Sequence, residues 1–308
     1  MKRKRDMIES IRVETLTMNR QFMRYVVILV VCALAASGVY AQQPSSDAKP
    51  TNALAQLDYA QAQIAENASN YDSAINLYGK VIEREPSFWQ AAYKRGEAYA
   101  IQENYKAAVD DYNRVIELQP DFAMAYAARA VAYEQLNDHA NAISDSNKAI
   151  ELKVTDDYVY FNRGLAYLGI KEYEKAITDF TYWIDLNPKT YPVAYFYRSR
   201  AYYAVSNLKG TIDDLDIFIE LQPKSGTILA DRAYIHRLMG NYDDAISDYT
   251  KAIELKPTGL DQLYYQRGQT YGLQGQYDKM LDDLREYAKI AGAQTEASVV
   301  DLLKNHQQ

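Results

Sequence analysis

Arginine and aspartate recur at a fixed separation along most of the chain, and this pairing of opposite charges is its most regular chemistry. Six arginines are each followed, 16 residues later, by an aspartate: Arg95, Arg129, Arg163, Arg198, Arg232 and Arg267 precede Asp111, Asp145, Asp179, Asp214, Asp248 and Asp283. At the equivalent places nearer the N-terminus, Gln61 and Leu77 replace both partners together. Because burying an unpaired charge is unfavourable, this joint absence predicts structural ion pairs between residues 16 apart. The alternative is that the arginines bind an anionic ligand.

Residues that commonly carry out catalysis form no comparable pattern. The three histidines are His139, His236 and His306, and the first two stand where other copies of the same sequence pattern carry a ring. The sequence holds no glycine-rich phosphate loop, no metal-ligand spacing and no Ser–His–Asp arrangement. We therefore expect no enzyme activity, no cofactor and no metal.

Charge and cysteine content narrow the classes of partner. The formal net charge is −7, and basic residues are concentrated before the apolar run at 25–38. The rest of the chain is more acidic still, which disfavours nucleic acid, since its binding depends on neutralising phosphates. Cys32 is the only cysteine, so disulfides and thiolate metal sites are excluded from the remainder of the chain.

The N-terminal segment has the organisation of an export signal. Arg20 and Arg24 precede the apolar run 25–38, and Val39-Tyr40-Ala41 is followed by a polar stretch. The pattern predicts a signal peptide at 1–41, with Met18 or Met23 as possible starts, and a linker at 42–54. We expect export, into a bacterial periplasm. The alternative is an uncleaved membrane anchor, although a bilayer span needs about 20 apolar residues.

A period of 34 residues organises most of the chain beyond this linker. Two columns of small residues recur, together with columns of aromatic rings between them, and a proline closes most copies of the pattern. Apolar residues at helical spacing predict two amphipathic helices per repeat, and the proline cannot continue the second helix. The predicted repeats span 55–88, 89–122, 123–156, 157–190, 192–225, 226–259 and 261–294, followed by a capping helix and tail at 295–308.

The period, the paired helices, the small and aromatic columns and the closing proline together resemble the tetratricopeptide repeat (TPR). The resemblance implies an all-α fold, an α-solenoid in which the repeats stack into a right-handed superhelix. Each repeat then relies on its neighbours to cover its apolar face.

The resemblance also implies a concave groove, lined by the first helix of each repeat, that receives segments of partner proteins. The residues placed there are Tyr59, Tyr93, Phe161, Phe196, Arg200, Tyr203, Tyr234, Arg237 and Tyr265. Aromatic residues and arginine dominate binding hot spots; the alternative is that these rings pack against the neighbouring repeat. Because Arg200 and Arg237 make the later groove basic, a partner with acidic and aromatic character fits best.

The sequence therefore predicts an exported, non-catalytic scaffold that binds protein or peptide segments and no nucleic acid. Two alternatives stay open. One is an envelope-assembly component that is anchored in the membrane by its N-terminus. The other is a subunit that presents substrates to an enzyme on another chain.

Overall fold

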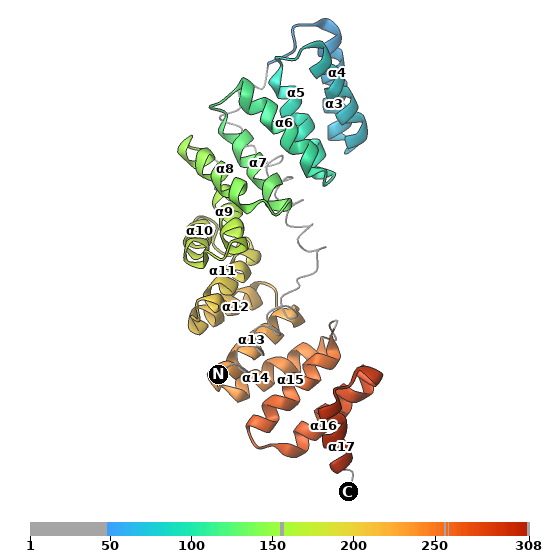
Figure 1. Cartoon of the computed structure of the whole chain (residues 1–308), viewed down its shortest axis with the longest axis vertical. Helices are drawn as coiled ribbons and strands as arrows, with labels where there is room; N and C mark the ends of the chain where they lie inside the picture. Colours follow the sequence, from blue (N-terminus) through green and yellow to red (C-terminus); the bar gives the residue numbers. More distant parts are fainter. Residues whose placement is uncertain (1–47, 155–156, 256, 258, 307–308) are drawn as a thin grey trace. The chain divides into compact units, whose positions relative to one another are not determined.

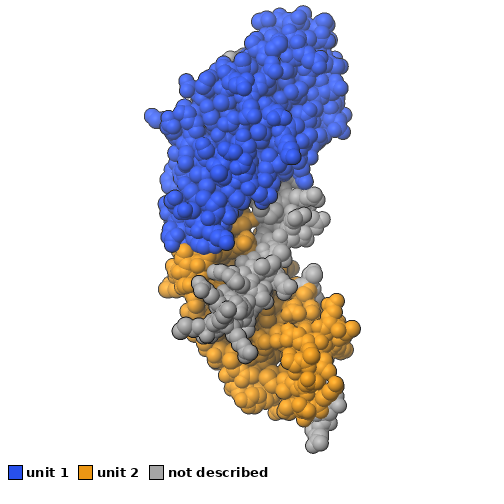
Figure 2. Space-filling model, in the orientation of Figure 1, with its two compact units in different colours: residues 1–186 blue, residues 187–308 orange. Residues whose placement is uncertain are grey.

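The computed structural model describes residues 48–154, 157–255, 257 and 259–306, and all regular secondary structure in these ranges is helical (Figure 1). The predicted signal peptide lies outside the described residues. The chain divides into two compact units, Met1–Leu186 and Asn187–Gln308 (Figure 2). We call them the N-terminal and the C-terminal unit.

The described part of the N-terminal unit consists of four helix pairs. They are α3 (Ala53–Asn67) with α4 (Tyr71–Arg84), α5 (Trp89–Ile101) with α6 (Tyr105–Leu118), α7 (Ala123–Gln135) with α8 (His139–Glu151), and α9 (Tyr158–Gly169) with α10 (Tyr173–Leu186). Helix α3 begins inside the predicted linker because the side chain of Asn52 accepts hydrogen bonds from the amides of Leu54 and Ala55 and caps it.

The C-terminal unit continues the same arrangement in the part that the structure describes. Its pairs are α11 (Pro192–Ala204) with α12 (Leu208–Leu221), α13 (Gly226–Met239) with α14 (Tyr242–Glu254), and α15 (Leu260–Leu273) with α16 (Tyr277–Ala291); a 3₁₀ turn (Gly292–Gln294) and α17 (Ala297–Asn305) follow. Val299 of α17 is buried against Leu284 and Tyr287 of α16. Helix α17 thereby covers apolar surface at the end of the last repeat.

Within each unit, every helix packs against the next one along the chain, so the result is an all-α solenoid of helical pairs. In the N-terminal unit the odd-numbered helices also touch one another, α5 with α7 and α7 with α9. We call the odd-numbered helices from α3 to α15, which open the helix pairs, the first helices. The surface that they form within a unit is its first-helix face.

The small-residue columns let the two helices of a pair approach closely. A Cβ atom added to Gly96 would lie 2.7 Å from the ring of Tyr112, and one added to Gly164 would lie 2.8 Å from the ring of Phe180. Both rings are buried. A larger residue at either glycine would therefore have to displace a packed aromatic side chain.

The turn between the two helices of a repeat has the same backbone in all seven pairs of the described chain. In each turn one residue takes a positive φ. These residues are Ser69, Glu103, Asn137, Lys171, Ser206, Gly240 and Gly275. In several repeats the next residue caps the second helix, as Asn70, Asn104, Asp138 and Asn207 do through their side-chain oxygens. The turn thus needs a left-handed residue followed by a polar cap, and only the last two repeats use glycine.

Exchanging residues at this turn should change stability in opposite directions. Lys171 has φ 66°, and a left-handed conformation costs a residue with a Cβ about 1–2 kcal/mol. We expect Lys171→Gly to raise the free energy of unfolding by about 1 kcal/mol, because the strain outweighs the added freedom of the unfolded chain. Gly275, with φ 76°, provides the reciprocal test: Gly275→Ala should lower it by about 1 kcal/mol. Urea unfolding measures the free energy of unfolding of both variants. A lower value in both would contradict the role of the left-handed conformation.

Candidate partner-binding surface

The arginine and aspartate columns meet inside each of repeats two to seven. The Arg163 guanidinium donates through Nε and Nη2 to both carboxylate oxygens of Asp179, at 2.8 and 2.7 Å. The same two-bond fork joins the other five pairs: Arg95 with Asp111, Arg129 with Asp145, Arg198 with Asp214, Arg232 with Asp248 and Arg267 with Asp283. The aspartates are buried. Because these arginines are neutralised within their own repeats, they are not free to bind an anionic ligand.

Arg129, Arg163, Arg232 and Arg267 also reach the preceding repeat through Nη1, a contact that sequence reasoning missed. The acceptors are Asn113 for Arg129, Asn147 for Arg163, Asp216 for Arg232 and Thr250 for Arg267, at 2.6, 2.7, 2.6 and 2.9 Å. These acceptors occupy one column of polar residues on the second helices, a signal that the sequence did contain. Each of these arginines therefore ties two neighbouring repeats together.

Tyrosine rings flank most of the paired arginines. The Arg163 guanidinium lies 5.4 Å from the centroid of Tyr160 and 5.9 Å from that of Tyr167. Arg129, Arg198 and Arg267 each lie between two tyrosines in the same way. Cation–π attraction thus adds to the ion pair at the same column.

Three of the predicted groove residues do not offer an open surface. Phe161 is 0 % exposed, Phe196 is 2 % and Tyr93 is 5 %. Phe161 packs against Phe180 and Trp183, and Tyr93 against Tyr112 and Phe122. For these three the packing alternative describes the structure, because the second helix of the same repeat, or the start of the next repeat, covers the ring.

The other predicted groove residues are half-buried, and Tyr203, Tyr234 and Arg237 contact a neighbouring first helix. In the C-terminal unit, the rings of Tyr203 on α11 and Tyr234 on α13 lie 6.4 Å apart. Arg237 on α13 donates to Gln269 on α15 at 2.9 Å. The six residues of this group are Tyr59, Arg200, Tyr203, Tyr234, Arg237 and Tyr265. Five of them lie on α11, α13 and α15, so they share the first-helix face of the C-terminal unit.

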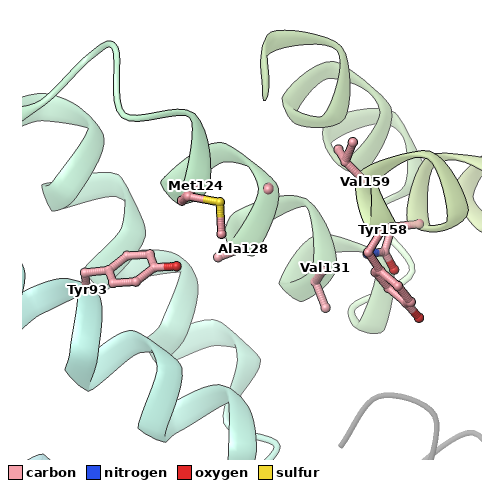
Figure 3. Close-up of a pocket in the computed structure, with 8 residues that line it drawn as sticks. Tyr93, Met124, Ala128, Val131, Tyr158 and Val159 are labelled. Atoms are coloured by element: carbon pink, nitrogen blue, oxygen red, sulfur yellow. The ribbon is translucent and has the colours of Figure 1, made fainter. Parts of the chain in front are cut away.

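The N-terminal unit carries a shallow apolar hollow on its first-helix face. Figure 3 shows Tyr93 of α5 on one side, Met124, Ala128 and Val131 along α7, and Tyr158 and Val159 of α9 on the other side. Ala127 and Asn162 complete the lining, and the enclosed volume is ≈ 10 Å³. The hollow exists because repeat three has small residues where the flanking repeats carry rings. Apart from Tyr93, sequence reasoning missed this lining, and the signal for it was the missing ring at Ala127.

Carboxylates dominate the polar groups beside this hollow. Lys94 lies 2.8 Å from Glu97 and 3.3 Å from Glu66, so one ammonium serves two carboxylates. The hydroxyl of Tyr78 donates to Glu66 at 2.5 Å. Burial raises the pKa of Glu97, and Lys94 opposes that rise. The cluster thus contains two carboxyl groups and one ammonium, whereas Arg200 and Arg237 of the C-terminal unit have no carboxylate bound.

Some polar side chains of the C-terminal unit have no hydrogen-bond or ion-pair partner among the described residues. The Tyr249 hydroxyl on α14 is fully buried and has no hydrogen-bond partner there. Arg200 on α11 and Asp231 on α13 likewise make no hydrogen bond or ion pair in the described chain. Asp231, Tyr234 and Arg237 act electrostatically on the Tyr249 hydroxyl.

Asp231 gives the chain a pH-dependent stability with a defined sign. Burial raises the pKa of this carboxyl to about 8, although Arg200 opposes the shift; in an unfolded chain it would be about 3.9. Between these values the folded state keeps a proton that the unfolded state releases. The stabilising contribution is therefore complete below pH ~4 and is lost as pH rises through about 8. Asp231→Asn should flatten this part of the curve of unfolding free energy against pH, and superimposable curves would contradict the assignment.

Neither metal-binding nor membrane-spanning features occur in the described ranges. No cluster of three or more His, Cys, Asp or Glu side chains there could hold a metal ion. None of the helices in the same ranges has the length and apolar character to cross a bilayer.

Comparison with known families agrees with the fold. Sequence profiles described as tetratricopeptide repeat match residues 59–121, 102–157, 158–190, 227–258 and 261–294. The chain therefore belongs to the tetratricopeptide-repeat family. No functionally curated protein matches its sequence.

Solved structures share the fold at low sequence identity. The C-terminal part of a TPR repeat-containing protein from Cytophaga hutchinsonii is similar with a TM-score of 0.67 and 16% identity, covering 79% of this chain and 98% of that one. A tetratricopeptide repeat protein from Parabacteroides merdae gives a TM-score of 0.56 and 18% identity, covering 82% and 98%. YrrB, described as a TPR protein with an unusual peptide-binding site, gives 0.53 and 16%, covering 59% and 94%.

Proposed function

We propose that this protein is an exported scaffold that binds segments of partner proteins on its first-helix faces and has no catalytic activity of its own. The observation that carries the proposal is the group of half-buried tyrosines and arginines shared by α11, α13 and α15. Such side chains supply most of the free energy of binding at protein interfaces.

Family membership supports the same function. TPR proteins bind protein or peptide segments, and YrrB, which shares the fold, is described as having a peptide-binding site. The six Arg–Asp pairs form a ladder of ion pairs that contributes stability. Its arginines do not bind the partner, because their own aspartates neutralise them.

Capture by crosslinking from an envelope extract tests the binding surface. The parent chain is compared with a Tyr234→Ala/Arg237→Ala variant and with Tyr277→Ala, which removes a ring that is 64% exposed on the second helix α16. We expect the partner to be lost only with the first variant. A partner lost only with Tyr277→Ala, or kept by both variants, would remove the first-helix face as the binding surface.

Export is tested by the N-terminus of the mature protein. The predicted cleavage after Ala41 requires the mature chain to begin at Gln42, which intact-mass measurement of protein from the envelope fraction reads directly. A chain that retains residues 1–41 and sediments with membranes would show that the protein is anchored and not cleaved. The alternative of a membrane-anchored assembly component would then hold.

A further inference from the structure

We propose that the first-helix face of the C-terminal unit holds a binding site for the side-chain carboxylate of an acidic, aromatic protein segment. The site consists of Arg200 on α11, Arg237 and Asp231 on α13, and the buried Tyr249 hydroxyl on the second helix α14. This inference rests on the proposed function and specifies which partner chemistry that face selects.

The site contains groups with unused hydrogen-bonding capacity. A buried hydroxyl without a hydrogen-bond partner is unfavourable. The Tyr249 side chain is 0% exposed, and its hydroxyl has no partner among the described residues. The equivalent tyrosine of the first repeat, Tyr78, donates its hydroxyl to Glu66. The Tyr249 hydroxyl therefore lacks the carboxylate acceptor that Tyr78 has within its own chain.

The two arginines of the site have no carboxylate partner among the described residues. Arg200 lies over the Phe196 ring at 5.9 Å and has no ion pair among the described residues. Arg237 lies over the Tyr234 ring at 5.3 Å and bonds only to the neutral amide of Gln269. In contrast, the neighbouring Arg232 contacts two aspartates. Two guanidiniums of the C-terminal unit thus remain without a bound carboxylate.

The charge around Asp231 is positive. Arg200 on α11 is the charged group that acts on the Asp231 carboxyl. Arg237 on α13 acts on the Tyr249 hydroxyl, on which Asp231 acts as well. On α12, which also packs against α13, Asp216 is bound to Arg232. Because burial raises the pKa of Asp231 to about 8, the carboxyl is protonated at neutral pH and can donate a hydrogen bond. The two guanidiniums and the Tyr249 hydroxyl then supply positive charge and a donor, which suits a carboxylate.

The rings beside the site indicate what accompanies this carboxylate. Tyr203 and Tyr234 lie edge to face at 6.4 Å, and Tyr265 lies on the next first helix. Aromatic faces in such a setting pack well against a further aromatic ring. The segment that fits is therefore one in which Glu or Asp alternates with Tyr or Phe.

The test uses short synthetic peptides and the protein purified from cells that express the full sequence. The peptides are N-acetylated and C-amidated, so that only side chains differ: one alternates Tyr with Glu, and its matched forms carry Gln or Lys in place of Glu. A fourth peptide has the Gln sequence with a free C-terminal carboxylate. Fluorescence anisotropy gives each dissociation constant near pH 7 and at low and moderate salt.

We expect the Glu peptide to bind about tenfold or more tightly than the Gln peptide, with affinity falling as salt rises. Arg200→Ala/Arg237→Ala should abolish this preference, while Lys209→Ala, an exposed cation on α12, should leave it intact. Tyr249→Phe should weaken the Glu peptide several-fold and raise the melting temperature of the free protein, because it removes an unsatisfied hydroxyl.

Asp231→Asn distinguishes an anionic from a cationic ligand side chain. For a carboxylate ligand this variant should bind the Glu peptide as tightly as the parent near neutral pH, and should lose the fall in affinity that the parent shows above pH ~8. Tighter binding of the Lys peptide, lost with Asp231→Asn, would overturn the inference in favour of a cationic side chain. Tighter binding of the peptide with the free C-terminus would overturn it in favour of chain-end recognition.

The same measurements distinguish this inference from the proposed function. If all the peptides bind equally and Tyr234→Ala weakens all of them, the carboxylate site is wrong while the first-helix face remains a binding surface. If no peptide binds and partner capture is also unaffected by Tyr234→Ala/Arg237→Ala, both are wrong.

Discussion

Arg163→Ala and Asp179→Ala will each lower the free energy of unfolding by about 3 kcal/mol, and the double variant will lose little more than either single variant. The Asp179 side chain is 5% exposed and the Arg163 side chain 18%. Removing one partner of a buried pair leaves the other charge uncompensated, which typically costs about 3–5 kcal/mol. The partial exposure of the guanidinium places this pair at the lower end of that range. In the equivalent pairs, burial raises the pKa of Asp111 and of Asp214, and the hydrogen bonds from Arg95 and Arg198 oppose that rise.

A matched surface pair provides the control for this double-mutant cycle. Lys209 and Asp213 lie 2.6 Å apart on α12, but their side chains are 81% and 56% exposed. Surface pairs contribute about 0–1 kcal/mol, so Lys209→Ala and Asp213→Ala should show little coupling. Urea unfolding followed by circular dichroism gives the coupling energies. Additive losses at Arg163 and Asp179 would refute the structural role of the ladder.

Phe161→Ala will be the second strongly destabilising change, with a loss of about 3–5 kcal/mol. The Phe161 ring is fully buried and lies 5.1 Å from the ring of Trp183 and 5.6 Å from that of Phe180. Truncation to alanine removes apolar contact and leaves a cavity among rings that cannot collapse to fill it. A variant at this position therefore cannot report on partner binding, since it weakens the fold itself.

Tyr234→Ala provides the comparison for Phe161→Ala. Tyr234 is half-buried and touches Tyr203 and Arg237 at the surface, so its loss should cost about 1 kcal/mol or less. Thermal unfolding of the two variants should separate them clearly. An unchanged melting temperature in Phe161→Ala, together with loss of partner capture, would restore Phe161 to the binding surface.

The repeat could be predicted from the sequence because its signals are local and recur. Helical spacing of apolar residues, the small-residue columns and the closing prolines set the helix pairs, and each repeat supports the next. The matched absence of charge at Gln61 and Leu77 also indicated which aspartate each arginine would meet. The left-handed turn was less visible, because residues such as Glu103 and Lys171 take a conformation that their types disfavour.

The exposure of individual rings could not be predicted in the same way. The helical period places Phe161, Phe196 and Tyr234 on first helices, but burial depends on the size of residues elsewhere. Trp183 covers Phe161, and Phe218 lies 6.3 Å from Phe196, where repeats three and six have Ala149 and Ala252 at the equivalent place. The alanine-rich hollow on α7 and the meeting of Asp231 with Tyr249 likewise depend on contacts between helices that no single column contains.

The first-helix faces of the two units differ in the charged groups that they carry. In the N-terminal unit Glu66 and Glu97 share one Lys94, whereas in the C-terminal unit Arg200 and Arg237 have no carboxylate bound. Charge of this kind governs which segments associate quickly and which are repelled. We therefore expect the two units to favour different stretches of a partner chain.

Site-specific photocrosslinking in living cells tests the central claim most directly, that the first-helix face is the partner-binding surface. A photoreactive phenylalanine analogue replaces Tyr234 on α13 in one strain and the exposed Tyr277 on α16 in another. The account predicts a crosslinked partner from Tyr234 and none from Tyr277. A partner crosslinked from Tyr277 alone would contradict it and would move the binding surface to the second helices.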